Sequence, residues 1–256
     1  MNTGVLAGVL IPFFGTALGA GLVLFMKREF NFFLEDFLSA LAGGIMTAAS
    51  VWSLIIPATE DCAYLGRWAF LPCCIGIIAG CIFMIVSDKI TDFLFSVRVG
   101  EMTRFKTMPM ILAVTIHNIP EGMAVGCVYA SAIESENEHL LTAAFALALG
   151  IAVQNIPEGA VISMPLYASG KSKGKAILSG VVSGVVEPLG AVSALLMARV
   201  IGILLPYFLS FAAGAMLFVV AQELIGEIKY SGKLPLKGMG FTLGFMIMMS
   251  LDVALS

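Results

Sequence analysis

Eight apolar stretches divide the chain, and each is long enough to cross a lipid bilayer as a helix. A membrane-spanning helix needs about 20 consecutive, mostly apolar residues. Short polar connections join the stretches, so we expect no attached soluble domain and treat residues 1–256 as a single transmembrane domain. The pattern predicts an all-α, multi-pass integral membrane protein built as an eight-transmembrane-helix bundle. The predicted helices cover residues 4–26, 36–57, 71–95, 108–130, 140–168, 174–199, 201–226 and 236–255.

Composition agrees with a membrane assignment. Hydrophobic residues make up 59% of the chain and charged residues 12%, and the mean hydropathy is +1.00. In soluble domains about a quarter of the residues are charged. The net charge of -3 is small, and the sequence has no basic patch with interleaved aromatic residues. We therefore expect the lipid bilayer as the surroundings of the chain, and no nucleic-acid partner.

Basic residues fall mainly on alternate connections, which orients the bundle. With the N-terminus outside, 12 of the 14 Lys and Arg residues lie on inner connections. Cytoplasmic loops carry an excess of these residues, so we expect both termini outside, in a cell membrane or a bacterial inner membrane. No cleaved signal peptide is expected, because the first basic residues follow the first apolar stretch. The inner basic residues are Lys27, Arg28, Lys89, Arg98, Arg104, Lys106, Lys171, Lys173, Lys175, Lys229, Lys233 and Lys237.

A repeated hexapeptide lies deep inside the fourth and fifth apolar stretches. It reads HNIPEG from His117 and QNIPEG from Gln154. Side chains four residues apart share one face of a helix, so His117 and Glu121 point the same way, as do Gln154 and Glu158. The proline of each copy lacks an N–H group and leaves one carbonyl of its own helix unpaired. Two adjacent helices could therefore direct an imidazole, two carboxylates and several amide oxygens at one volume.

Three glutamates stand in the middle of apolar stretches: Glu121, Glu158 and Glu187, the last of which precedes a proline. A charged side chain at the centre of a membrane helix costs ~2.5–3.5 kcal/mol. No Lys or Arg lies at matching depth, so protons or a bound cation must neutralise the glutamates. Together with His117 they form a nitrogen and oxygen donor set that suits zinc, iron, manganese or cadmium. Each residue alone could be a hydrogen-bonded core histidine or a protonated acid at a kink, but the repeat and the third carboxylate favour a metal site.

The two N-x-P-E-G helices and the Glu-Pro pair on the following helix resemble the ZIP (Zrt-/Irt-like protein) family of divalent metal transporters. Gln154 at the start of the second motif is similar to the GufA-like branch of that family. The likeness covers the whole chain, including residues 43–46 and 53–57 of the second stretch. It implies a single transporter domain, a homodimer, and transport of zinc or of Cd2+, Fe2+ or Mn2+ toward the cytoplasm. It also implies an elevator-like shift of helices one, four, five and six against helices two, three, seven and eight.

The resemblance further implies a binuclear metal site between helices four, five and six. The family often has aspartate where Asn155 stands, so the second metal here would bind loosely or modulate transport. By match, the first metal position would consist of His117, Glu121, Gln154 and Glu158. The second position would share Glu121 and Glu158 and would add Asn118, Asn155 and Glu187.

Two other functions stay open. A membrane metalloenzyme would need motifs such as H-E-x-x-H or paired E-x-x-H, which the chain lacks. His117 and His139 are the only histidines, and His139 lies in an outer connection, so two histidine ligands cannot meet at one site and we expect no enzyme. A metal-sensing or purely structural membrane protein would bind metal without carrying it across the bilayer.

Residues around the predicted site keep two interpretations each. By match, Met46 and Ser53 would line the path above the metals, although plain packing explains them equally well. Glu223 and Glu227 would act as a gate or as acids of an inner vestibule. The outer connection between stretches four and five would attract cations weakly or would be an ordinary solvated loop. Its charged residues are Glu134, Glu136, Glu138 and His139.

Small residues and cysteines are spread along the apolar stretches. Small residues permit close helix contact, so they would serve packing or would let one group of helices slide past another. The cysteines form no C-x-x-C pair, so we expect buried small hydrophobic residues and no thiolate metal site. The small residues are Gly43, Gly44, Ala48, Ala49, Gly180, Gly184, Ala212, Ala213 and Gly214, and the cysteines are Cys62, Cys73, Cys74, Cys81 and Cys127.

Overall fold

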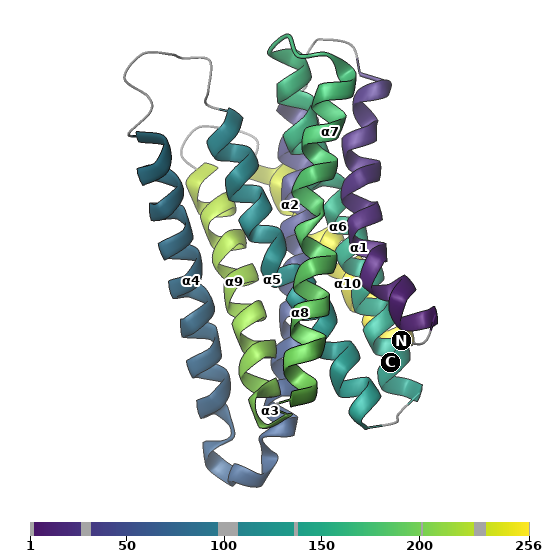
Figure 1. Ribbon diagram of the computed structural model, residues 1–256, viewed down its shortest axis with the longest axis vertical. Helices are drawn as coiled ribbons and strands as arrows, with labels where there is room; N and C mark the ends of the chain where they lie inside the picture. Colours follow the sequence, from purple (N-terminus) through teal and green to yellow (C-terminus); the bar gives the residue numbers. More distant parts are fainter. Residues whose placement is uncertain are drawn as a thin grey trace.

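The protein is all-helical in its computed structural model, which describes residues 3–26, 32–96, 107–135, 138–200, 202–227 and 234–255 (Figure 1). Eight stretches are long and apolar enough to cross a membrane, as predicted from the hydropathy pattern. The long helices are α1 (Thr3–Gly21), α2 (Phe32–Ala49), α4 (Phe70–Ser96), α5 (Thr107–Glu134), α6 (Glu138–Ala168), α9 (Leu205–Glu227) and α10 (Leu234–Leu255). Shorter elements are η1 (Leu22–Leu24), η2 (Ser50–Ile55), α3 (Ile56–Asp61), η3 (Ala63–Trp68), α7 (Lys173–Gly184), α8 (Val186–Val200) and η4 (Gly202–Leu204).

Orientation across the membrane stays a prediction. Both termini lie toward the lower end of the bundle in Figure 1, as an even number of spans requires. The basic residues that predicted which end is inside lie largely outside the described residues. These residues are Lys27, Arg28, Arg98, Arg104, Lys106, Lys229 and Lys233.

The second and sixth spans are not regular α-helices. The second span runs from α2 through six residues of π-helix, η2, into α3. The sixth span is divided into α7 and α8, where the sequence predicted one continuous helix. Pro188 has no N–H group to bond the carbonyl of Gly184, and the chain tightens there into a turn in which the Val185 N–H bonds the Val182 carbonyl at 3.2 Å. The break places Glu187 in the first turn of α8.

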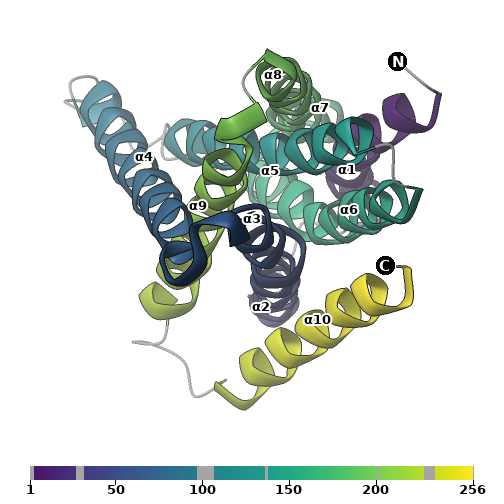
Figure 2. The ribbon, with the colours of Figure 1, turned by 90° about the horizontal axis from the view of Figure 1, so that it is seen from below.

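The helices form two groups, which Figure 2 shows along the bundle axis. The α5–α6 group contains α1, α5, α6, α7 and α8, and its most extensive contacts join α1 with α6 and α5 with α8. The α2–α9 group contains α2, α3, α4, α9 and α10, and its most extensive contacts join α2 with α10 and α4 with α9. The two groups meet along a seam where α5 contacts α9 and α6 contacts α2 and α10.

Glycines bring helices into backbone contact inside each group. A Cβ atom at Gly122 of α5 would lie 2.0 Å from the carbonyl oxygen of Glu187 in α8. A Cβ atom at Gly44 of α2 would lie 2.0 Å from the carbonyl oxygen of Phe241 in α10. Among the glycines with described surroundings, each such approach to the backbone of another helix falls within one group. Gly44, Gly180, Gly184 and Gly214, four of the small residues with two interpretations, therefore pack helices together inside one group.

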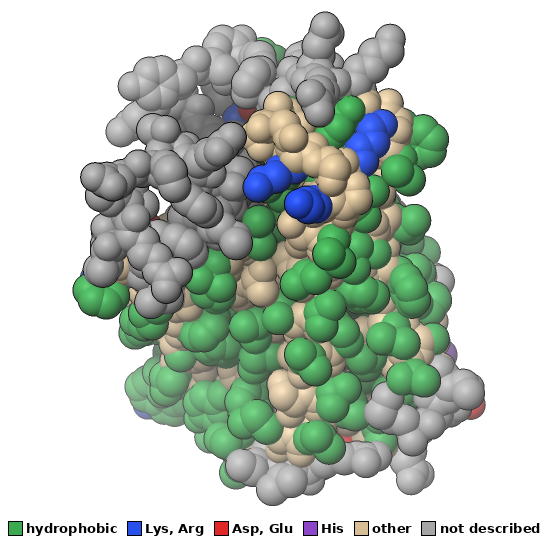
Figure 3. Space-filling model, turned by 45° about the horizontal axis from the view of Figure 1, so that its top comes forward, with side chains coloured by type: hydrophobic (Ala, Val, Ile, Leu, Met, Phe, Trp, Pro, Cys, Tyr) green, Lys and Arg blue, Asp and Glu red, His purple; other side chains and the backbone are tan. Residues whose placement is uncertain are grey.

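The outer surface of the bundle suits a bilayer. Figure 3 shows hydrophobic side chains covering the flank and Lys and Arg side chains gathered near the upper end. Helix α4 exposes Ile75, Ile78 and Ile82, which are 54–58% accessible. Lys171 and Lys175 are exposed at the turn between α6 and α7. The protein is thus a multi-pass integral membrane protein with an apolar flank and a basic end.

The cysteines match their prediction in part. All five are free thiols. Cys62, Cys73 and Cys127 are buried, Cys81 is half-buried, and Cys74 is exposed on the outside of α4. Burial raises the pKa of the Cys62 thiol, which lies just beyond the end of the second span. Three of the five therefore behave as the expected small hydrophobic residues.

Candidate metal centre

A small cavity lies on the seam between the two groups of helices. Its volume is ≈ 40 Å³, which exceeds the roughly 10–15 Å³ needed to hold one water molecule. His117 and Glu121 of α5 and Glu158 of α6 line it from the α5–α6 group, and Met46 of α2 and Val219 of α9 line it from the α2–α9 group. The other lining residues are Ser39, Ala42, Val114, Pro157 and Val161. Three of the predicted ligands therefore face one volume, at the place where the groups meet.

The two hexapeptides are joined directly by a hydrogen bond. The Gln154 amide donates from Nε2 to Glu121 Oε1 at 2.9 Å, and both side chains are buried. This bond ties the first position of the second motif to the fifth position of the first motif. It also directs the Gln154 amide nitrogen toward Glu121, which leaves the amide oxygen Oε1 for another partner.

A second cluster surrounds Glu187, which is 0% exposed. Asn118 donates from Nδ2 to Glu187 Oε1 at 3.1 Å, and Asn155 donates from Nδ2 to Glu187 Oε2 at 2.8 Å. The hydroxyl of Thr16 in α1 also donates to Oε1. The cluster thus joins four helices, α1, α5, α6 and α8, through one carboxylate.

Three amide oxygens near these carboxylates have no hydrogen-bond partner among the described residues: Asn118 Oδ1, Gln154 Oε1 and Asn155 Oδ1. All three side chains are 0% exposed. Leaving a buried polar group without a partner costs about 1–3 kcal/mol, so native proteins rarely do it without a reason. Oxygen ligands for a metal ion would supply that reason, since a cation gives each oxygen the partner it lacks.

The glycine that closes each hexapeptide explains how these side chains meet. A Cβ atom at Gly122 would strike the backbone of Glu187, and one at Gly159 would lie 2.1 Å from the carbonyl oxygen of Thr16. Only glycine lets α5 approach α8 and α6 approach α1 so closely. The motif therefore supplies both the candidate ligands and the contacts that bring the helices together.

Carboxylates, imidazole and thiols do not complete a site by themselves. In the described part of the chain, no three His, Cys, Asp or Glu side chains lie close enough together to hold one ion. His117 Nε2 lies 3.8 Å from Asp88 Oδ1 of α4, too far for a hydrogen bond. Gln222 donates to the other oxygen of Asp88 at 3.0 Å. A metal site here would therefore need amide oxygens as further ligands. Asp88 and Gln222 are also neighbours of His117, although no sequence motif marks them.

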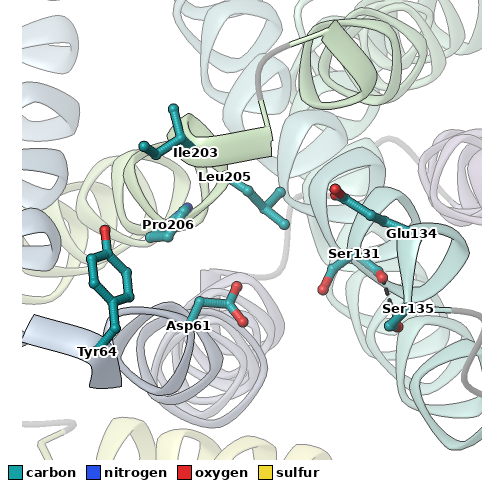
Figure 4. Close-up of a pocket in the computed structure, with 8 residues that line it drawn as sticks. All are labelled: Asp61, Tyr64, Ser131, Glu134, Ser135, Ile203, Leu205 and Pro206. Carbon is teal, nitrogen blue, oxygen red and sulfur yellow. Dashed lines mark hydrogen bonds between the residues drawn. The ribbon is translucent and has the colours of Figure 1, made fainter.

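A larger cavity of ≈ 300 Å³ opens at the α3 end of the bundle, which is the predicted outer end. Asp61 and Tyr64 line it from the α2–α9 group, and Glu134 lines it from the α5–α6 group (Figure 4). The other lining residues are Ser131, Ser135, Ile203, Leu205 and Pro206. Glu134 thus faces a cavity that both groups share.

The structure places several of the residues that had two interpretations. Met46 lines the small cavity, whereas Ser53 donates to Asp252 Oδ1 of α10 at 2.8 Å. Glu138 and His139 are exposed at the start of α6. Glu136 and the side chains of Glu223 and Glu227 lie outside the described part of the chain.

Comparison with known proteins gives matches over most of the chain. The family model described as ZIP Zinc transporter matches residues 98–252, a range that contains all seven predicted site residues. Zinc transporter GufA of Myxococcus xanthus is 33% identical, with the alignment covering 100% of both chains. Zinc transporter ZIP11 of Homo sapiens is 31% identical over 94% of each chain. Zinc transporter ZIPB of Bordetella bronchiseptica is 34% identical over 95% of this chain and 78% of its own length.

Proposed function

Since this chain belongs to the ZIP zinc transporter family, we propose that it carries zinc across its membrane toward the cytoplasm through the cavity on the seam. It is a transporter and not an enzyme. Residues 1–256 form one transporter domain in this proposal, with both termini outside. Cadmium, iron and manganese follow the same route, because they accept the same nitrogen and oxygen donors.

The proposed site lies between the fourth, fifth and sixth spans and has two metal positions. The first position uses the imidazole of His117, the carboxylates of Glu121 and Glu158, and the amide oxygen of Gln154, which would have to draw closer around the ion than the described structure places them. The second position shares Glu121 and Glu158 and adds Asn118, Asn155 and Glu187. With asparagine at position 155 the second metal meets one charge fewer, so it binds more loosely than the first.

The observation that carries this proposal is the set of three buried amide oxygens without partners, beside Glu121 and Glu187. A structural cluster would satisfy its own oxygens with donors, as the nitrogen atoms of the same amides are satisfied. Neutral oxygens next to buried carboxylates suit a divalent cation, which needs several ligands and supplies the missing positive charge.

The seam suggests how the metal crosses. Residues of both groups line the small cavity, so a shift of one group against the other would open it to a different side of the membrane. This motion is the elevator-like shift that we propose for the chain. Metal enters through the cavity of Asp61 and Glu134, sheds water, and is held at the seam. Release follows when inner solvent or protons weaken the carboxylate ligands, since metal ligands must be deprotonated.

The test is zinc flux into liposomes that contain the purified protein and an internal zinc dye. Saturable influx is expected for the wild type, and Glu121→Ala is expected to abolish it while the protein remains folded. Asp92→Ala is the matched control, because Asp92 is an exposed carboxylate on α4 away from both cavities. Full influx through Glu121→Ala would refute transport through this site. Zinc binding without influx in the wild type would favour a sensor instead.

The proposal extends to assembly and location. We infer a homodimer in a cell membrane or a bacterial inner membrane, as the family resemblance implies. Cross-linking of the protein in intact membranes tests the dimer, since a dimer gives a product of twice the monomer mass at low protein density.

A further inference from the structure

We propose that Thr16 is a positioning residue of the metal site, whose hydroxyl holds Glu187 so that the amide oxygens of Asn118 and Asn155 face the metal. Thr16 lies on α1, far in sequence from the hexapeptides, and is 0% exposed. The inference rests on the proposed function and adds a residue to it.

Thr16 takes one of the bonding positions of the Glu187 carboxylate. A carboxylate accepts at about four lone-pair positions. Thr16 and Asn118 occupy two positions on Oε1, and Asn155 occupies one on Oε2. One position is left, so Glu187 can give a metal at most one bond while these three donors stay in place. The main role of Glu187 is therefore to hold the Thr16 hydroxyl and the Asn118 and Asn155 amides in place.

Anchoring Glu187 fixes both asparagine amides. An amide NH2 group has two hydrogens, and in each asparagine Glu187 is one of two acceptors. Asn118 Nδ2 also contacts the Ser183 carbonyl at 3.4 Å, and Asn155 Nδ2 contacts the Pro12 carbonyl at 3.4 Å. With both nitrogens held on that side, each Oδ1 is turned away, and neither has a partner among the described residues.

Thr16 is directed at Glu187 and not at its own helix. A threonine inside a helix commonly bonds the carbonyl four residues earlier, as Thr47, Thr115 and Thr242 do here. The corresponding carbonyl for Thr16 is that of Pro12, which accepts from Asn155. The hydroxyl is thus free for the carboxylate.

Two glycines keep Thr16 in place. A Cβ atom at Gly159 would lie 2.1 Å from the Thr16 carbonyl oxygen. A Cβ atom at Gly184 would lie 2.9 Å from Thr16 Cβ and 3.1 Å from Glu187 Oε1. The backbone of Thr16 thus packs against Gly159 and its side chain against Gly184, which leaves the side chain little room to move away from Glu187.

The experiment measures KM and Vmax of zinc influx into liposomes for Thr16→Val, Thr16→Ser and wild type. Valine keeps the shape of threonine and removes the donor, so we expect KM to rise about tenfold, the effect of one lost hydrogen bond to a charged group. Vmax is expected to change by less than about twofold. Serine keeps the donor and is expected to restore KM to within about twofold of wild type. Thr242→Val is the control, because that hydroxyl bonds only its own helix in α10.

Two results would overturn the inference. One is an unchanged KM in a folded Thr16→Val protein. The other is a KM for Thr16→Ser as high as that of Thr16→Val, which would show that keeping the hydroxyl donor does not restore the site. Where valine gives no folded protein, Thr16→Ala replaces it as the variant without a hydroxyl. Absence of influx in the wild type would defeat the proposed function itself, whereas normal wild-type influx with an insensitive position 16 defeats only this inference.

Discussion

Replacing Gly122 by alanine should separate α5 from α8 at the metal site. The added Cβ atom would lie 2.0 Å from the Glu187 carbonyl oxygen and 2.8 Å from the carbonyl carbon. A comfortable C···O contact is about 3.3 Å or longer, so the helices must part by more than about 1 Å. The Asn118–Glu187 hydrogen bond is already 3.1 Å long. A displacement of that size would stretch it past the range of a hydrogen bond.

The size of the effect follows from these distances. Overpacking a tight contact costs about 1–3 kcal/mol, and Gly→Ala in a helix returns up to about 1 kcal/mol through helix propensity. Gly238→Ala is the control that measures the gain in helix propensity alone, because a Cβ atom there meets nothing within 4 Å. We expect Gly122→Ala to melt several degrees below Gly238→Ala, at about 2–4 °C per kcal/mol. Zinc influx should fall about tenfold or more, because the lost bond holds a ligand in place.

The assays are thermal unfolding in detergent and zinc influx in liposomes, on both variants and the wild type. The two measurements separate an effect on folding from an effect on transport. Equal melting temperatures for Gly122→Ala and Gly238→Ala would show that α5 and α8 are not in backbone contact at this position. Wild-type influx through a destabilised Gly122→Ala protein would show that the contact supports folding alone and that the spacing of α5 and α8 does not set the metal site.

Two further predictions concern the ligands. His117→Ala should reduce the preference for zinc over manganese, because it removes the one nitrogen ligand from a set that otherwise consists of oxygens. Influx measured with both metals present gives the ratio of zinc to manganese transported, and an unchanged ratio would count against a ligand role for His117. Asn155→Asp should make folding more dependent on metal, because a second carboxylate replaces the N–H group that now donates to Glu187 at 2.8 Å. Thermal unfolding with and without zinc should give a larger stabilisation than in wild type, and an equal one would contradict the second metal position.

Hydropathy alone predicted the spans because a bilayer leaves few alternatives to helices of that length. It could not predict where a span changes its helical form. The break between α7 and α8, just before Glu187, depends on Pro188 and on a tight turn at Val185. Apolar residues on both sides keep the hydropathy pattern continuous there, so the pattern does not show the break. The π-helix η2 likewise lies inside the second apolar stretch, where no proline or glycine marks it.

The candidate ligands were predictable because the hexapeptide repeats, and chance rarely places the same polar motif in the middle of two apolar helices. Thr16 gave no such signal, since a lone threonine in an apolar helix commonly bonds its own backbone. Asp88 belongs to no sequence motif, so nothing in the sequence marks it as a neighbour of His117. Their roles depend on contacts across 171 and 29 sequence positions, which only the packing of the helices brings together.

Gly150 and Met248 stand opposite one another on the seam, with α6 on one side and α10 on the other. A Cβ atom at Gly150 would lie 2.1 Å from the Met248 sulfur, so this glycine faces a flexible side chain, whereas Gly44 and Gly122 face the rigid carbonyls of Phe241 and Glu187. Methionine adapts its shape at little cost. Under the proposed sliding motion, substitutions at this place would change the rate at which the two groups slide past one another. They would leave the packing inside each group unchanged. Related chains could therefore diverge in turnover rate through seam residues alone, while the metal ligands and the interior of both groups stay as they are.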